Sequence, residues 1–279
     1  MKLRCKDLVL SLDRTLIMGV LNVTPDSFSD GGLWFEDKDA IAHGLEMVAH
    51  GAAIIDVGGE STRPGAAAVP ATEELRRVLP VVEAIAASSS VPISIDTRKP
   101  EVAARAVVAG ASIINDTAGE EADPEMDDVA VESGAAIVVM HSRGSPATMR
   151  SLTDYSSVVD DVAAWLDERA RALVGKGVSA ESVALDPGIG FAKSPEQSLE
   201  LLNGVHEVLA IGHPVVIGTS RKSFIGAVLD LPEDQRLEGT AASVAWAVAK
   251  GVQIVRVHDV EAMARVVRMT EAIRNAESR

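Results

Sequence analysis

The sequence predicts a single (β/α)8 barrel, and three observations support this fold. Eight short apolar runs rich in Val, Ile, Leu and Ala alternate with longer stretches of helical character, as in a parallel sheet connected by helices. The chain has 279 residues, close to the roughly 250 that such a barrel needs. Apolar residues make up 47% and aromatic residues only 3%, which suits aliphatic strands buried on both faces. We therefore expect one domain over residues 1–279.

The apolar runs have the lengths and compositions of buried strands. In chain order they are LIMGVLN (16–22), AIIDVGG (53–59), VPISID (91–96), SIIND (112–116), AIVVMH (136–141), VALD (183–186), PVVIGT (214–219) and QIVRV (253–257). The helical segments between them are rich in Ala, Glu and Val, and several end in Gly, a frequent helix stop. Pro100 and Pro124 stand near expected helix starts, where proline is tolerated. An open doubly wound sheet is the alternative, but eight β–α units match the closed barrel.

The charge and the cysteine content exclude several classes of protein. The formal net charge of −15 disfavours binding to nucleic acid or to anionic membranes, since both are negatively charged. Cys5 is the only cysteine, so no internal disulfide can form, which suits a reducing compartment. The first residues carry charges where a signal peptide needs an apolar stretch, and no run of about 18 apolar residues follows. We expect a cytoplasmic protein.

Polar side chains stand where the predicted strands end. The carboxyl ends of all strands share one rim of a barrel, and active sites are built there. Helix capping could explain one or two of these residues, and a purely structural rim is the alternative. Buried polar groups are costly without partners, however, so we expect a functional mouth. Its members are Asn22, Asp56, Asp96, Asn115, Asp116, Met140, His141, Asp186, Thr219, Arg256 and His258.

The residue types at this mouth suggest what it binds. Asp96, Asn115 and Asp186 offer hydrogen-bond acceptors, which suit a flat heterocycle with an amidine-like N–C–NH2 edge. The cationic side chains suit an anion such as phosphate. Asn22 could give an oxygen ligand to Mg2+, which usually keeps several waters and binds substrate phosphates. The candidates for the anion site are Arg63, Lys222, Arg256 and His258.

The blocks around these residues resemble the signature sequences of the dihydropteroate synthases. The match runs in order from about residue 16 to 260 and includes a block at each of the eight predicted strand ends. The blocks NVTPDSFSDGG and DVGGESTRPG are highly specific. The other blocks are ISIDTRKP, IINDTAG, MHSRGSPATM, LDPGIGFAKS, IGTSRKSFIG and RVHDV.

The resemblance implies a transferase of folate biosynthesis. Such an enzyme is a (β/α)8 barrel and a homodimer that requires Mg2+. It joins (7,8-dihydropterin-6-yl)methyl diphosphate to 4-aminobenzoate, giving 7,8-dihydropteroate and diphosphate, and sulfonamides compete with the 4-aminobenzoate. The family mechanism is dissociative: diphosphate leaves first, and the aniline nitrogen attacks a cationic pterin methylene. No nucleophilic side chain is required, and the sequence offers no evident Ser–His–Asp set.

The resemblance also implies a role for individual positions. The catalytic residues would be Asp96, Lys222 and Arg63. The pterin would be held by Asp96, Asn115, Met140, Asp186 and Lys222, with Arg256 stacked over it. The diphosphate would meet Asn22, Thr62, Arg63, Arg256 and His258, and the metal would meet Asn22. The 4-aminobenzoate would be bordered by Thr62, Arg63, Pro64, Phe191 and Ser223.

Two other functions fit parts of the sequence. A non-catalytic pterin-binding paralogue should have lost some of the anion-site residues, yet Asn22, Arg63, Lys222 and His258 are all present. A related barrel that binds a reduced folate for methyl transfer would share the pterin positions but would have no reason to keep the STRPG and SRK blocks. The departures from the family pattern are small, at Thr117, Ala118 and the additional cation Arg143.

Overall fold

The eight predicted strands form one parallel, barrel-shaped sheet in the computed structural model, which describes residues 1–24, 33–61 and 68–276. The order around the sheet is β8-β7-β6-β5-β4-β3-β10-β9. A parallel bridge between Leu185 and Val215 joins β8 to the chain entering β9 and brings the two edges together. The strands are β3 (Leu16–Asn22), β4 (Ile54–Gly58), β5 (Ile93–Thr97), β6 (Ile113–Asp116), β7 (Ala136–Met140), β8 (Val183–Asp186), β9 (Val216–Gly218) and β10 (Ile254–Val257).

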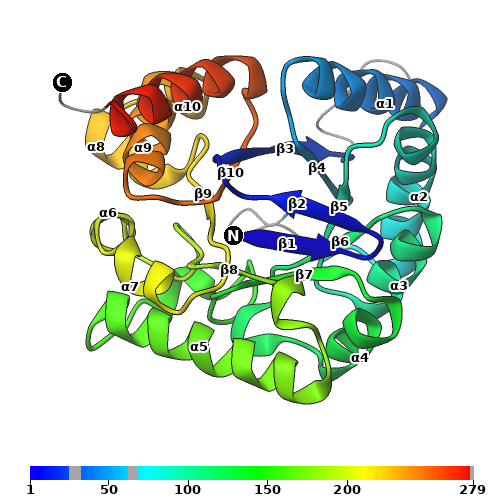
Figure 1. The fold of residues 1–279 in the computed structure, drawn as a ribbon, viewed down its shortest axis with the longest axis horizontal. Coiled ribbons are helices and arrows are strands. Elements are labelled where there is room, and N and C mark those ends of the chain that lie inside the picture. Colours follow the sequence, from blue (N-terminus) through cyan, green and yellow to red (C-terminus); the bar gives the residue numbers. More distant parts are fainter. Residues whose placement is uncertain (25–32, 62–67, 277–279) are drawn as a thin grey trace.

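Helices surround the sheet, so the barrel expectation is confirmed (Figure 1). Pro100 and Pro124 each occupy the first helical position, as expected. The helices are α1 (Leu33–Ala49), α2 (Ala71–Ser88), α3 (Pro100–Ala109), α4 (Pro124–Ser133), α5 (Val158–Lys176), α6 (Pro195–Asn203), α7 (Val205–Ala210), α8 (Ser223–Leu229), α9 (Leu237–Ala249) and α10 (Val260–Arg274). Single 3-10 turns lie at Gly119–Glu121, Met149–Ser151, Ala180–Ser182 and Glu233–Gln235.

A two-stranded hairpin that the sequence did not predict precedes the barrel. Its strands are β1 (Lys2–Cys5) and β2 (Leu8–Ser11), paired antiparallel. Figure 1 shows the hairpin lying across one end of the barrel. Leu3 and Cys5 point inward and are fully buried. They join the side chains that fill the barrel at this end, so the hairpin acts as a plug.

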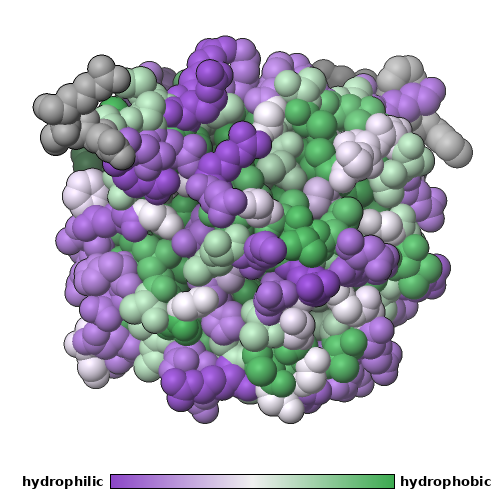
Figure 2. Space-filling view, viewed as in Figure 1, coloured by the Kyte–Doolittle hydropathy of each residue, from purple (hydrophilic) through white to green (hydrophobic). Residues whose placement is uncertain are grey.

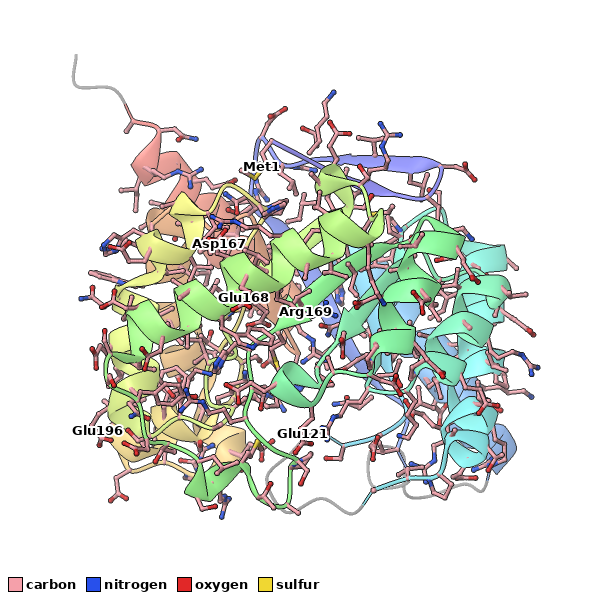
Figure 3. All side chains as sticks on the ribbon, turned by 90° about the horizontal axis from the view of Figure 1, so that it is seen from below. Met1, Glu121, Asp167, Glu168, Arg169 and Glu196 are labelled. Carbon is pink, nitrogen blue, oxygen red and sulfur yellow. The ribbon has the colours of Figure 1, made fainter. Side chains whose placement is uncertain are left out.

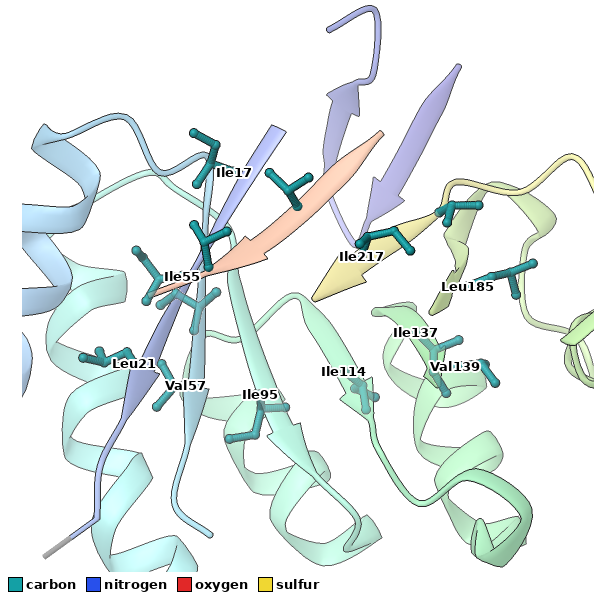
Figure 4. Close-up of a cluster of buried hydrophobic side chains, with 14 of the residues drawn as sticks. Ile17, Leu21, Ile55, Val57, Ile95, Ile114, Ile137, Val139, Leu185 and Ile217 are labelled. Atoms are coloured by element: carbon teal, nitrogen blue, oxygen red, sulfur yellow. The ribbon is translucent and has the colours of Figure 1, made fainter. Parts of the chain in front are cut away.

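The barrel has two apolar layers, because successive side chains of a strand point to opposite faces of the sheet. The inner layer fills the barrel beneath its mouth with residues such as Met18, Ile54 and Val138. The outer layer packs against the helices, and Figure 4 shows part of it. The outer residues labelled there are Ile17, Leu21, Ile55, Val57, Ile95, Ile114, Ile137, Val139, Leu185 and Ile217.

The surface shows polar and apolar residues interspersed on the hairpin face (Figure 2). No helix in the described part of the chain is both long and apolar enough to span a membrane.

Candidate active site at the carboxyl ends of the strands

The strand register brings the predicted polar residues to one level at one end of the barrel. Asp96 of β5 lies beside Gly58 of β4 on one side and Asn115 of β6 on the other. Met140 is in register with Asp186 on the far side of the ring. Figure 3 shows that the hairpin and the loops after the strands lie at opposite ends of the barrel. Met1 of the hairpin is at one end, and Glu121 and Glu196, which follow β6 and β8, lie toward the other. These strand-end residues therefore meet at the mouth away from the plug.

Arg256 of β10 links two carboxylates at the centre of this mouth. Its Nε donates to Asp56 Oδ2 at 2.6 Å, and its Nη2 donates to Asp96 Oδ2 at 2.7 Å. Asn115 Nδ2 also donates to Asp56 Oδ2, at 3.2 Å, and Thr117 Oγ1 donates to Asp96 Oδ1 at 3.2 Å. One guanidinium thus orients two acids from neighbouring strands, and the amide and the hydroxyl hold those acids in place.

Asp56 is a part of the site that the predicted set of binding residues omitted. Its side chain is fully buried in β4. Among the described residues its Oδ1 has no hydrogen-bond partner, although such an atom is costly to bury. The signal was visible in the sequence, because Asp56 interrupts an otherwise apolar strand. Its role in the structure is to hold Arg256 and Asn115.

Burial shifts the ionisation of the acids and of the lysine at the mouth. Removal from water raises the pKa of Asp96 to about 7; the positive charge of Arg256 opposes this shift and the negative charge of Asp56 adds to it. Burial also raises the pKa of Asp186, against the opposing charge of Lys222. For Lys222, burial lowers the pKa to about 8, with Asp186 opposing. The charges of this site therefore depend on one another.

The loop after β8 joins the site from the side opposite to β4. Asp186 Oδ1 accepts a hydrogen bond from the backbone N–H of Gly188 at 2.7 Å. Lys222, just before α8, donates to the carbonyl of Ile189, and its ammonium lies 4.5 Å from the centre of the Phe191 ring. The loop therefore places Phe191 next to a cation at the mouth.

Comparison with known proteins agrees with this geometry. A family model described as "Pterin binding enzyme" matches residues 18–258. The dihydropteroate synthase of Bacillus subtilis is 48% identical over 263 residues, which cover 94% of this chain and 90% of that one. The chain belongs to the dihydropteroate synthase family.

Solved structures of this family share the whole fold. A Xanthomonas albilineans dihydropteroate synthase with 4-aminobenzoic acid has a TM-score of 0.92 and 40% identity, over 99% of both chains. A Yersinia pestis dihydropteroate synthase in a sulfonamide complex has a TM-score of 0.93 and 39% identity, over 99% of this chain and all of that one. Another Xanthomonas albilineans structure contains 7,8-dihydropteroate.

The structure brings most of the predicted family site together. Asn22 and Asp96 flank Gly58, since a Cβ at this glycine would lie 3.5 Å from Asp96 Cβ and 3.7 Å from Asn22 Oδ1. His258 lies further out, where its Nδ1 is 2.9 Å from Ser220 Oγ. Ser223 is exposed at the start of α8, beside Lys222. The predicted residues Thr62, Arg63 and Pro64 lie outside the described residues.

Proposed function

We propose that this chain condenses (7,8-dihydropterin-6-yl)methyl diphosphate with 4-aminobenzoate to give 7,8-dihydropteroate and diphosphate. The observation that carries the proposal is the convergence of Asp96, Asn115, Asp186 and Lys222 beside Arg256 at one mouth. The 48% identity to the Bacillus subtilis dihydropteroate synthase supports the same reaction. This makes the chain a transferase of the folate pathway.

The pterin ring fits the acceptors and donors at the bottom of the mouth. Carboxylates of Asp96 and Asp186 accept from N–H groups, and Asn115 can both accept and donate. Lys222 donates to a ring oxygen or nitrogen, and the plane of the Arg256 guanidinium suits stacking on a flat heterocycle. Met140, at the end of β7 next to Asp186, adds an apolar contact for the ring.

The charges at the mouth favour a cation-like transition state. Asp56, Asp96 and Asp186 contribute three carboxyl groups, whereas Arg256 and Lys222 contribute two cations. The group carries one net negative charge when all five are ionised, which for Asp96 requires a pH above about 7. In the proposed step the bond between the pterin methylene carbon and the diphosphate oxygen breaks, and diphosphate keeps the electron pair. The amine nitrogen of 4-aminobenzoate then bonds to the methylene carbon and loses a proton. A negative site in low dielectric stabilises the positive charge that develops on the pterin.

The outer rim suits the diphosphate and one divalent metal. Among the described residues there is no group of three or more His, Cys, Asp or Glu side chains that could hold a metal by itself. Asn22 nevertheless offers an amide oxygen near Asp96, which fits Mg2+ held by one protein ligand, waters and substrate phosphate oxygens. Bound there, Mg2+ would neutralise diphosphate charge. Arg63, Thr62, Arg256 and His258 would hold the remaining oxygens.

The second substrate would lie between Phe191 and Ser223, and the family resemblance assigns Thr62, Arg63 and Pro64 to it as well. Phe191 supports this placement, because its ring lies beside Lys222 at the same mouth. Sulfonamides, which resemble 4-aminobenzoate in shape, should bind there as well. We expect sulfonamide inhibition to decrease as the 4-aminobenzoate concentration increases, and inhibition that is independent of 4-aminobenzoate would argue against this placement.

The direct test is product formation by the purified protein. The pterin diphosphate is incubated with Mg2+, with and without 4-aminobenzoate, and both diphosphate and dihydropteroate are measured. We expect dihydropteroate only when all three components are present. Tight binding of the pterin with no product would instead identify a non-catalytic paralogue.

The surface also supports a homodimer. Large apolar side chains are exposed on the neighbouring helices α8, α9 and α10, and apolar groups of this kind mark interaction surfaces. We propose that these helices form the dimer contact. The exposed residues are Val228, Leu229, Leu237, Trp246, Met269 and Ile273. We also propose a cytoplasmic location, since the single cysteine cannot form an internal disulfide.

A further inference from the structure

A buried lysine lies behind the mouth, outside the set of residues assigned to the substrates. Lys193, in the loop after β8, is only 8% exposed. Its Nζ lies 2.9 Å from the carbonyl oxygen of Phe191, 3.0 Å from Nδ1 of His141 and 3.3 Å from the carbonyl oxygen of His141. The lysine amine therefore ties the loop after β8 to the end of β7.

The loop after β8 needs these hydrogen bonds because alternate residues of its backbone adopt the left-handed conformation. Gly188, Gly190 and Ala192 alternate in the left-handed region, with φ of 67°, 80° and 49°. Side chains from other segments hold the carbonyls between and beside them. Lys222 donates to Ile189, and the Tyr155 hydroxyl donates to Ala192 at 3.0 Å. These carbonyl contacts orient the part of the loop that carries Phe191.

His141 is a neutral, closely packed partner of this lysine. Burial, together with the positive charges of Lys193 and Arg143, lowers the pKa of His141 to about 2, so the ring is neutral. The planes of the His141 and Trp165 rings are perpendicular, with 5.1 Å between the ring centres. A neutral imidazole can accept at Nδ1 when the other nitrogen carries the proton. In the other tautomer Nδ1 carries the proton and donates to a neutral lysine amine, so the contact forms with either tautomer.

Lys193 is also a costly residue for mere packing. Burial lowers its pKa well below the ordinary value, with the charge of Asp186 opposing and that of Lys222 adding to the effect. An apolar side chain of similar length would avoid this desolvation cost. An apolar side chain would nevertheless leave the carbonyls of His141 and Phe191 without their donor.

We propose that Lys193 is a positioning residue for the condensation, which holds the loop after β8 so that Phe191 and Lys222 face the two substrates in the reactive arrangement. This inference rests on the proposed function. No substrate contact is assigned to Lys193, whose buried amine is directed at atoms of His141 and Phe191. Its effect passes through Phe191 to the 4-aminobenzoate, and through the Ile189 carbonyl to Lys222.

The test compares Lys193→Met with Lys193→Gln in the full chain. Methionine keeps the length of the side chain and loses the donor, whereas glutamine keeps one donor group. Steady-state kinetics would be measured against each substrate, together with thermal melting. Lys193→Met should raise KM for 4-aminobenzoate about tenfold or more, since a small misplacement of a binding group has a large kinetic effect. The glutamine variant should recover part of that loss.

A negative control, Lys38→Met, and a positive control, Tyr155→Phe, separate a positioning role from a general loss of stability. Lys38→Met removes an exposed lysine from α1 and should leave both KM values unchanged. Tyr155→Phe removes only the hydroxyl that donates to Ala192, so it should raise KM for 4-aminobenzoate by roughly threefold while the protein remains folded. If Lys193→Met does not fold, the comparison of Lys193→Gln with Tyr155→Phe decides the question in the same way.

The outcomes distinguish this inference from the proposed function. A folded Lys193→Met protein with wild-type KM and kcat would overturn the positioning role. If only Lys193→Gln folds, wild-type kinetics in both Lys193→Gln and Tyr155→Phe would overturn it. A lower melting temperature with unchanged kinetics would overturn it as well, because Lys193 would then be purely structural. Failure of the wild-type protein to form dihydropteroate would instead refute the proposed reaction.

Discussion

Arg256 decides the electrostatics of the mouth at the scale of single residues. It reaches across the barrel to Asp56 and Asp96, which lie 200 and 160 positions away in the sequence. Both acids are almost fully buried, so each depends on this one guanidinium. Removing one partner of a buried charge group is expensive because it leaves an uncompensated charge. The three residues therefore act as one unit.

The pH dependence of the reaction should report the ionisation of Asp96. Its carboxylate form is the one that stabilises a positive charge on the pterin, and burial raises its pKa to about 7. A group with a raised pKa is still protonated just below that pH, so kcat/KM should fall as the pH drops through about 7. It should fall again above about pH 8, where Lys222 loses its proton. The measurement is kcat/KM from pH 5.5 to 9, a range that extends roughly 1.5 pH units or more on each side of the pKa of Asp96.

Substitution of Asp96 tests whether its carboxyl group causes the change in kcat/KM near pH 7. Asp96→Asn should lower turnover by at least about a hundredfold and remove the dependence on pH near 7, while circular dichroism shows an intact fold. Asp116→Asn is a matched control, since burial raises the pKa of Asp116 to about 6 in the same part of the barrel. A persistent pH step in Asp96→Asn, or its loss in Asp116→Asn, would assign the step to another group.

Cys5 should react with thiol reagents only when the chain unfolds. Its side chain is fully buried in the hairpin plug, and burial raises the pKa of the thiol to about 12. The thiolate is the reactive form, so alkylation by iodoacetamide at pH 8 should be slow in the native protein and fast in urea. Mass spectrometry of both samples measures this. Rapid alkylation of the native protein would mean that the plug opens readily.

At the scale of elements, the loop after β8 depends on glycine. Gly188 has φ of 67°, and a Cβ at this position would lie 1.9 Å from the carbonyl oxygen of His141. Gly188→Ala should therefore destabilise the fold by more than about 1 kcal/mol and lower activity by at least roughly tenfold. Urea unfolding and steady-state kinetics check the two effects.

Gly212→Ala is the control for backbone strain alone. Gly212 has φ of 96°, but nothing lies within 4 Å of a Cβ built there. This variant should cost about 1 kcal/mol of stability and leave the kinetics unchanged. Equal losses of activity in Gly188→Ala and Gly212→Ala would show that the close contact with the His141 carbonyl does not cause the loss of activity.

The hairpin plug should contribute strongly to stability. Leu3 is fully buried in the lower barrel core, whereas Val9 on the partner strand is 46% exposed. Leu3→Ala should lower the free energy of unfolding by about 2–5 kcal/mol, because it leaves a cavity. Val9→Ala should change it by less than about 0.5 kcal/mol. Similar urea midpoints for the two variants would contradict a plugging role.

For the whole molecule, the proposed dimer contact predicts a change of assembly state. Met269 and Ile273 are 62% and 64% exposed on α10, and two glutamates in their place would bury charge at the contact. The double variant Met269→Glu, Ile273→Glu should sediment as a monomer while the wild type sediments as a dimer. Val108→Glu is the control, since Val108 is 87% exposed on α3, outside the proposed contact. A dimeric double variant would place the contact elsewhere.

The repeated β–α pattern determined the barrel, because the burial of a parallel strand on both faces leaves a continuous apolar run that can be read locally. The predicted runs agree with the observed strands to within two residues at each end. The hairpin was not predicted: its two strands are only four residues long, and exposed charges alternate with Leu3 and Cys5. A strand that short is stabilised by the barrel it covers rather than by its own pattern.

By itself, the sequence determined which side chains stand at the strand ends, because the alternation of strand and helix places all carboxyl ends on one rim. Only the tertiary structure decided which of them pair. The sharing of Arg256 between Asp56 and Asp96, and the burial of Lys193 against His141, depend on the register of strands and loops distant in sequence. Ion pairs and buried hydrogen bonds require atoms to meet within a few ångströms, and a one-dimensional pattern does not contain those distances.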